Sequence, residues 1–270
     1  MNTYTHIITT RFNVPTESWT TTRTGHKALS EEWLRDRFEI FGKYCFPSFK
    51  NQSEKNFVWL VFFDEQTNGF YREKIKDFEK EFSNFTPVFV KDFPAMAAFV
   101  EDFAQSQNTD FIISADIDND DMLHRDYVKT VQQYFQPVHD FVIDLRIGLQ
   151  LAILPGNRAT VSQAYMAGSP FVSLVEKTPQ AKTVIKDRHP VYAQYPEIAI
   201  NTKDPMYIQL IHQFNMVNNE TKGLKRLVSF PQQEYGIVGE RMLEVSKTDA
   251  MLANLRRLSG KVLKKLKVKI

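Results

Sequence analysis

Four carboxylates lie within six residues in the segment 116–121: Asp116, Asp118, Asp120 and Asp121. Carboxylates this close repel one another unless a positive charge lies among them, and hard divalent cations with oxygen ligands are the usual partners. A Mg²⁺ or Mn²⁺ ion held in this way commonly bridges the phosphates of a substrate. The segment follows the apolar run 111–114 and precedes a helical pattern. We therefore interpret it as a metal-binding loop at the end of a strand.

Three other interpretations of this loop compete. It could be a solvated acidic turn that caps the following helix. The Asp-x-Asp-x-Asp spacing imitates an EF-hand, but Asp121 stands where that calcium loop needs Gly and Tyr127 where it needs a bidentate Glu. Phosphatases of the haloacid dehalogenase type also carry Asp-x-Asp after a strand, but we expect Thr or Val there in place of Asp120. The last two interpretations each disagree with a named residue.

The elements that position this loop form an alternating pattern of apolar runs and amphipathic helices. Strands are expected at 6–10, 57–63, 87–90 and 111–114, with helices between them. Ser30 is a good N-cap for the first helix, and Pro47 is expected to end it. Continuous apolar strands predict an α/β fold with a mostly parallel sheet covered on both faces. Ligands bind beyond the carboxyl ends of such strands, so residues 9–13, Asp64 and the acidic loop should share one crevice.

Composition and charge restrict the class of protein. The chain of 270 residues has ordinary fractions of apolar and charged residues, which favours one large globular domain. A single cysteine, Cys45, allows no internal disulfide and fits a reducing cytoplasm. Neither a signal peptide nor a membrane-spanning apolar run is evident.

The last residues differ from the rest in charge. The segment 247–270 carries a net charge of +7 and the remainder −5. Its leucines recur at helical spacing, which predicts a domain at 1–246 followed by a basic amphipathic tail at 247–270. This tail could lie on an anionic membrane surface or pack against the domain with a solvated basic face. Nucleic acid is not expected as a partner, because the remaining body is net acidic.

Several motifs in chain order carry a resemblance to a known family. The strings, which together cover most of residues 6–215, are Thr10-Arg11-Phe12-Asn13, Phe46-Pro47-Ser48-Phe49 with Gln52, the run 57–61 leading to Asp64, Asp118-Asn119-Asp120-Asp121, Ser169-Pro170-Phe171 and the segment 207–215. This set resembles glycosyltransferases of the GT-A fold, and more narrowly a bacterial family of rhamnosyltransferases. Tyr207 and Gln213 depart from the pattern, where Trp and Gly are expected.

The resemblance implies a nucleoside-diphosphate sugar donor and a Mn²⁺ or Mg²⁺ ion. It assigns Asp118 and Asp120 to the metal, with Asp118 also meeting the donor, and it adds His212 as a residue near the metal or diphosphate. The residues implied to line the donor crevice are Thr10, Arg11, Asn13, Asp64 and Asp116. The acceptor is expected to be a glycan or lipid-linked glycan in bacterial surface polysaccharide synthesis, and the enzyme to be cytoplasmic or peripheral on the inner face of the membrane.

An inverting transferase also needs a base near the acceptor hydroxyl. Glu176 and Asp144 are the candidates, although Glu176 could be a surface residue at a strand end and Asp144 could pair with Arg146. Two other functions remain open. A metal-dependent nucleotidyltransferase would share the nucleotide-binding half of the sheet, but residues 9–13 contain no glycine for a phosphate loop. A non-catalytic nucleotide- or Ca²⁺-binding module would bind metal without turnover.

Overall fold

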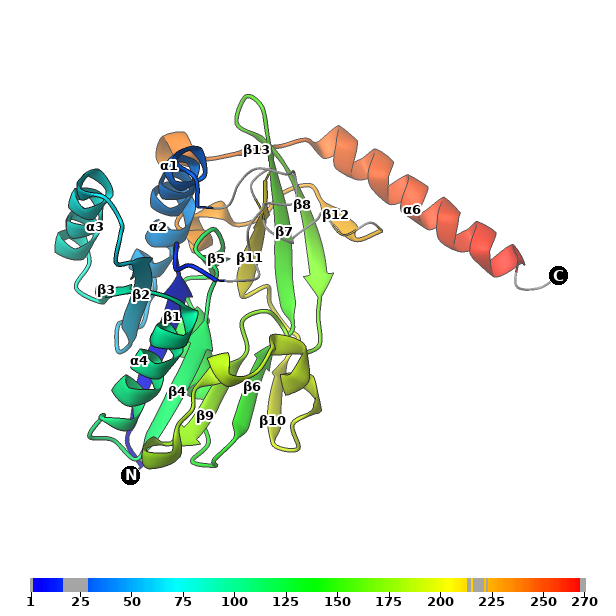
Figure 1. Ribbon diagram of the computed structural model, residues 1–270. Helices are drawn as coiled ribbons and strands as arrows, with labels where there is room; N and C mark the ends of the chain where they lie inside the picture. Colours follow the sequence, from blue (N-terminus) through cyan, green and yellow to red (C-terminus); the bar gives the residue numbers. More distant parts are fainter. Residues whose placement is uncertain (1, 17–28, 213–214, 216–220, 222, 268–270) are drawn as a thin grey trace.

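The computed structural model describes residues 2–16, 29–212, 215, 221 and 223–267, with side chains described as far as residue 259. Two sheets and the helices around them form the body, and the last helix extends away from it (Figure 1). The helices are α1 (Glu31–Ile40), α2 (Phe46–Lys50), α3 (Gly69–Glu81), α4 (Phe93–Gln105), α5 (Tyr127–Gln133) and α6 (Lys247–Lys267), with a π-helical turn at Phe41–Cys45 and short 3-10 turns at Thr178–Gln180, Val184–Lys186, His189–Gln194, Gln232–Tyr235 and Gly239–Arg241.

The first sheet has seven strands in the order β10-β6-β9-β4-β1-β2-β3. The strands are β1 (Tyr4–Arg11), β2 (Val58–Asp64), β3 (Phe85–Val90), β4 (Phe111–Asp116), β6 (Phe141–Leu145), β9 (Ser173–Lys177) and β10 (Ile198–Asn201). All neighbouring pairs are parallel except those of β9, which runs antiparallel to β4 and β6.

Helices cover both faces of this sheet. On β1, Ile8 packs into a phenylalanine-rich core with α1, α2 and α3, while the adjacent Ile7 faces Met96 and Val100 of α4. Successive strand residues point to opposite faces, so the continuous apolar runs are explained by burial on both sides. The predicted α/β architecture, a mostly parallel sheet flanked by helices, is confirmed.

The sequence did not predict the second sheet. It has the order β12-β8-β7-β11-β5, with β13 paired to β8. Its strands are β5 (Met122–Leu123), β7 (Ile147–Leu154), β8 (Arg158–Tyr165), β11 (Tyr207–Ile211), β12 (Lys225–Leu227) and β13 (Glu244–Val245). The acidic loop runs from β4 of the first sheet to β5 of the second, and therefore lies where the two sheets meet.

The expectation that Pro47 ends the first helix is wrong. The chain continues as a π-helical turn over Phe41–Cys45 and then as α2 to Lys50. Proline lacks an N–H and clashes with a carbonyl in the preceding helical turn. Here the wider turn resets the hydrogen bonding, since Phe46 N–H donates to the Phe41 carbonyl, and Pro47 falls in the first turn of α2, where a missing donor is tolerated. Ser30 caps α1 as expected, accepting a hydrogen bond from Trp33 N–H.

Candidate active site

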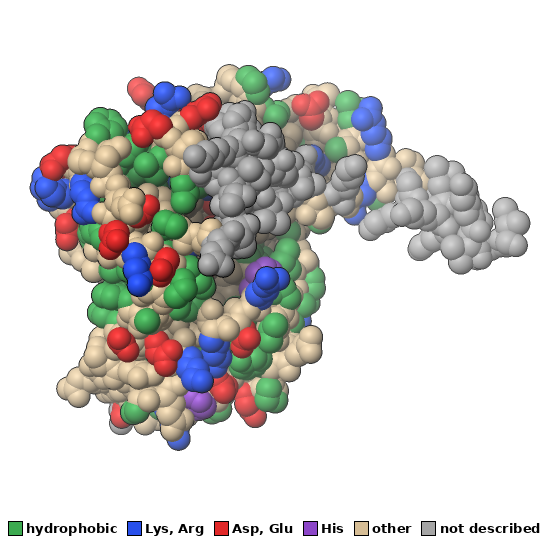
Figure 2. Space-filling model, in the orientation of Figure 1, with side chains coloured by type: hydrophobic (Ala, Val, Ile, Leu, Met, Phe, Trp, Pro, Cys, Tyr) green, Lys and Arg blue, Asp and Glu red, His purple; other side chains and the backbone are tan. Residues whose placement is uncertain are grey.

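A cavity of about 960 Å³ opens beyond the carboxyl ends of β1 and β4. Its lining comes from the end of β1, from α1, from the acidic loop and from the residues around Pro170, 184–192 and Gln209. Acidic and basic side chains are interspersed over the face of the body shown in Figure 2. The position at the strand ends is the one that the parallel-sheet rule anticipates for a ligand.

Asp116 and Asp118 line the cavity at the start of the acidic loop. Asp116 ends β4 and accepts a hydrogen bond from the Thr9 hydroxyl at 2.6 Å. Burial raises the pKa of Asp116, against the opposing influence of Thr9 and Arg11. Asp118 is exposed. Desolvation in the cavity and the neighbouring Asp120 and Asp116 carboxylates raise the pKa of Asp118 to about 7.

Asp120 is buried and held from three sides. Its Oδ2 lies 2.6 Å from Nη1 of Arg37 in α1, and it accepts hydrogen bonds from His212 Nε2 and Asn215 Nδ2, both at 2.9 Å. Burial alone would raise the pKa of this carboxyl, but Arg37 and the His212 hydrogen bond hold it well below its usual range. Asp120 therefore stays ionised inside the protein.

Asp121 is fully buried and only partly satisfied. Its Oδ1 accepts a hydrogen bond from Leu210 N–H of β11 at 2.7 Å, whereas its Oδ2 has no partner within the described part of the chain. Burial and the nearby Asp120 and Asp118 raise its pKa well above the usual value. A buried carboxylate oxygen without a partner is unfavourable, and a bound cation removes that penalty.

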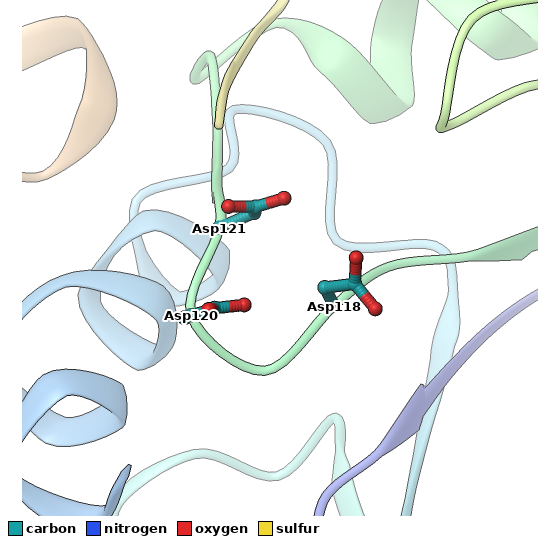
Figure 3. Close-up of side chains that lie close together, drawn as sticks. All are labelled: Asp118, Asp120 and Asp121. Carbon is teal, nitrogen blue, oxygen red and sulfur yellow. The ribbon is translucent and has the colours of Figure 1, made fainter. Parts of the chain in front are cut away.

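The residues present fit a hard divalent cation. One carboxylate oxygen from each of Asp118, Asp120 and Asp121 lies within 4.8 Å of the others, and Figure 3 shows the three side chains on the same short loop. Oxygen donors of this kind suit Mg²⁺ and Mn²⁺. His212 stands outside this group of three and instead donates to Asp120 through Nε2.

The residues predicted to line the donor crevice separate into two groups. Arg11, Asn13, Asp116 and Asp118 line the cavity. Thr10 is fully buried beneath it, where its hydroxyl accepts the indole N–H of Trp59 at 2.9 Å.

Asp64 also lies outside the cavity lining. Its carboxylate accepts the N–H of Gln66, and its own N–H donates to Asn13 Oδ1 at 3.1 Å. Because the Asn13 amide also donates to Thr67, this side chain ties the end of β1 to the turn after β2.

Glu176 and Asp144 are buried and occupied by hydrogen bonds. Glu176 accepts the N–H groups of Lys182 and Thr183 and pairs with Lys186 at 3.0 Å. In this position it anchors the segment that forms one wall of the cavity.

Asp144 pairs with Arg146 at 2.7 Å and accepts the N–H groups of Gly168 and Ser169. Neither carboxylate lines the cavity. Both hold the backbone around it.

Arg37, Asn119 and Asn215 are site residues that the sequence reasoning missed. Asn119 accepts from Arg37 and donates to the Arg11 and Phe12 carbonyls, so it joins the acidic loop to the end of β1. Arg37 left a readable signal, because it falls on the apolar stripe of α1 beside Leu34 and Phe38. A charged residue on a buried helix face needs a partner inside the protein.

The sequence profile of a family described as "Putative rhamnosyl transferase" matches residues 5–223. Among curated proteins, none matches the chain.

Solved structures show distant similarity. S. aureus TarS 1-349 has a TM-score of 0.44 at 9% identity, over 76% of this chain and 60% of that one. Its complex with UDP-GlcNAc has a TM-score of 0.44 at 10% identity, over 78% and 60%. A cytidylyltransferase from Leptospira borgpetersenii has a TM-score of 0.36 at 12% identity, over 75% and 77%. This chain thus spans 60% of the length of the TarS chain.

Proposed function

Since the chain belongs to the rhamnosyl transferase family, a family of glycosyltransferases, we propose that it transfers a sugar from a nucleoside-diphosphate donor with the help of a divalent cation. The observation that carries the proposal is the convergence of the Asp118, Asp120 and Asp121 carboxylates, two of which, Asp118 and Asp120, line a large cavity beyond the strand ends. Rhamnose is the sugar that the family description suggests.

In this proposal Asp118, Asp120 and Asp121 hold Mn²⁺ or Mg²⁺. When bound, the cation supplies positive charge that neutralises the diphosphate as it leaves. Arg11 lines the same part of the cavity, and its guanidinium lies 5.6 Å from the centre of the Phe93 ring. We assign Arg11 and Asn13 to the nucleotide side of the donor and Asp116 to the support of Arg11.

The acceptor is proposed to enter along the wall formed by residues 184–192. Within the described part of the chain, Asp187 is the one carboxylate outside the acidic loop that lines the cavity. It is exposed, so it can reach an acceptor hydroxyl and take its proton in an inverting transfer. A glycan or lipid-linked glycan of a bacterial surface polysaccharide is the acceptor class that we propose.

Helix α6 provides a proposed contact with an anionic membrane surface at the cytoplasmic face. Four large apolar side chains on its first turns are about half exposed or more: Met251, Leu252, Leu255 and Leu258. Asn254 fixes the helix to β12 through two hydrogen bonds with the backbone of Arg226. Within the described residues, no helix is both long enough and apolar enough to cross a membrane. A basic helix with an exposed apolar face binds at such a surface without crossing it.

Calorimetric binding of UDP, GDP, dTDP and CDP, with and without Mn²⁺, tests the proposal. The expected result is metal-dependent binding of one diphosphate by the wild type and loss of that binding in Asp120→Ala. Asp77→Ala is the matched control, because Asp77 is an exposed carboxylate of α3 that pairs with Lys80 far from the loop in sequence. Failure of every diphosphate to bind under any metal condition would remove the proposal's support.

Turnover separates the transferase from its alternatives. Release of the nucleoside diphosphate from the corresponding sugar donor, in the presence of an acceptor, supports glycosyl transfer. Formation of a nucleotide sugar from a nucleoside triphosphate and a sugar phosphate would instead identify a nucleotidyltransferase. Binding without either reaction would identify a non-catalytic module.

A further inference from the structure

Arg37 places a buried cation against the acidic loop. Its side chain, in the last turn of α1, is 4% exposed. Nη1 donates to Asn119 Oδ1 at 2.8 Å and lies 2.6 Å from Asp120 Oδ2, and the guanidinium carbon lies 4.8 Å from the centre of the Trp33 ring. A charged group is stable inside a protein only when it is paired and hydrogen-bonded. The contacts on several sides therefore fix the guanidinium in one place.

The contacts of Asp120 are one-sided. Arg37 from α1 and His212 and Asn215 from the end of β11 all meet the same atom, Oδ2. Among the described residues, Oδ1 receives no hydrogen bond. The carboxylate is thus held so that a single oxygen is left for a further ligand.

A second feature indicates what that ligand is. The side chain of Asp121 is fully buried, and its Oδ2 has no partner in the described part of the chain. Asp118, Asp120 and Asp121 each offer an oxygen within 4.8 Å of the others (Figure 3). A cation between them completes the coordination of the orphaned oxygen.

We infer that Arg37 is a positioning residue that holds Asp120 as a one-oxygen ligand and so favours Mn²⁺ or Mg²⁺ over Ca²⁺. Calcium takes six to eight oxygen ligands and readily uses both oxygens of a carboxylate, whereas Mg²⁺ requires a near-octahedral shell of single oxygens and water. With Oδ2 blocked by the guanidinium, Asp120 cannot offer both oxygens to one ion. The inference rests on the proposed metal-dependent function and names a residue that determines the metal specificity of that site.

Metal binding to the full-length chain, without nucleotide, tests this role. Free Mn²⁺ is measured by electron paramagnetic resonance, and Ca²⁺ is titrated in as a competitor. Arg37→Met is expected to lower Mn²⁺ affinity by about 10- to 100-fold, as loss of an outer-shell partner does, and to raise the affinity for Ca²⁺ relative to Mn²⁺. Arg37→Lys is expected to fall between, because a lysine keeps the charge but lacks the rigid planar guanidinium that fixes Nη1 between Asn119 and Asp120.

The matched control is Arg146→Met. Arg146 also forms an ion pair with a buried aspartate, Asp144, but this pair does not contact the acidic loop. Its loss should reduce thermal stability and leave both metal affinities unchanged. A purely structural role for Arg37 would give the same pattern as this control.

The outcomes distinguish the inference from the proposed function. Unchanged Mn²⁺ affinity and an unchanged Ca²⁺-to-Mn²⁺ ratio in folded Arg37→Met would overturn the role of Arg37 and leave the metal site standing. If Arg37→Met does not fold, the same two quantities in Arg37→Lys decide the matter in the same way. Absence of Mn²⁺ binding by the wild type would overturn both the inference and the metal dependence of the proposed function.

Discussion

Metal binding at the acidic loop should strengthen as the pH rises from 6 to 8. Desolvation, together with Asp120 and Asp116, raises the pKa of Asp118 to about 7, so a cation must displace a proton from this carboxyl near neutral pH. A group with this pKa is about one-tenth ionised at pH 6 and about nine-tenths ionised at pH 8, so proton competition alone changes the affinity about tenfold. Because Asp118 is exposed and solvent screens its neighbours, tenfold is the upper figure for the contribution of this one carboxyl.

Isothermal titration with Mn²⁺ at pH 6, 7 and 8 measures this effect. Repeating each titration in two buffers of different ionisation enthalpy counts the protons released on binding. We expect Asp118 to release about one proton near pH 6 and less at pH 8, in addition to the proton that Asp121, whose pKa is also raised, gives up. Asp118→Asn should bind more weakly and should lose this part of the pH dependence. Equal affinity at pH 6 and 8, with no proton released by the wild type, would refute the reasoning.

The same pKa predicts an effect on stability. Between the ordinary value of 3.8 and about 7, the folded chain holds a proton on Asp118 that the unfolded chain has lost. The folded state therefore binds more protons in this window, and the stability of the metal-free protein should fall as the pH rises through it. The ionised Asp120 has the opposite effect on stability, because its pKa lies below the ordinary value. Its contribution to stability is lost only as the pH falls below about 4, outside this window. The rise in Tm on adding Mn²⁺ should consequently be larger at pH 8 than at pH 6.

Three further predictions concern other parts of the chain. Asp187→Asn should lower turnover by about 10²- to 10⁴-fold, as loss of a general base does, and leave calorimetric Mn²⁺ affinity unchanged; undiminished turnover would exclude the assignment. Gly148→Ala should lower the free energy of unfolding by about 1–3 kcal/mol or more in urea titrations, because the added Cβ would lie 2.1 Å from the ring of Tyr207. The double substitution Leu255→Asp and Leu258→Asp should reduce co-sedimentation with vesicles that contain anionic lipid, without changing diphosphate binding. Equal co-sedimentation of the variant and the wild type would refute the proposed contact of α6 with the membrane.

The first sheet could be predicted from sequence because its signals are local. Strand β2 is an uninterrupted apolar run, and α1 has a serine cap followed by a periodic apolar face. The second sheet lacked such signals. Strand β5 has only two residues, and β11 reads equally as a strand or a helix until it pairs with β7. Pairing between segments distant in the chain determines these strands, and a local pattern does not contain it.

The acidic loop could likewise be recognised by its composition, whereas the partners of its carboxylates could not. The sequence indicated the Asp144–Arg146 pair as one alternative, and the structure confirms that pair. The backbone N–H groups that both Glu176 and Asp144 accept, and the pairing of Glu176 with Lys186, come from segments whose path the sequence does not show. The position of Asp187 in the cavity depends on the path of the segment after β9, which has no regular periodicity. Arg37 was missed although its charge beside Leu34 and Phe38 on the apolar face of α1 is a local signal of a buried partner.

The acidic loop joins the two sheets as well as lining the cavity. Asp121 accepts the backbone N–H of Leu210, and Asp120 binds His212 and Asn215, so the carboxylates of the proposed cation site also fasten β11 to the end of β4. Local opening of the second sheet at this seam must break these contacts and separate the loop's ligands from one another. An ion that binds only the closed arrangement therefore adds its binding free energy to the cost of that opening. The acidic loop therefore couples ion binding to the association of the two sheets. The free energy of opening between the sheets should depend on whether the loop has an ion bound.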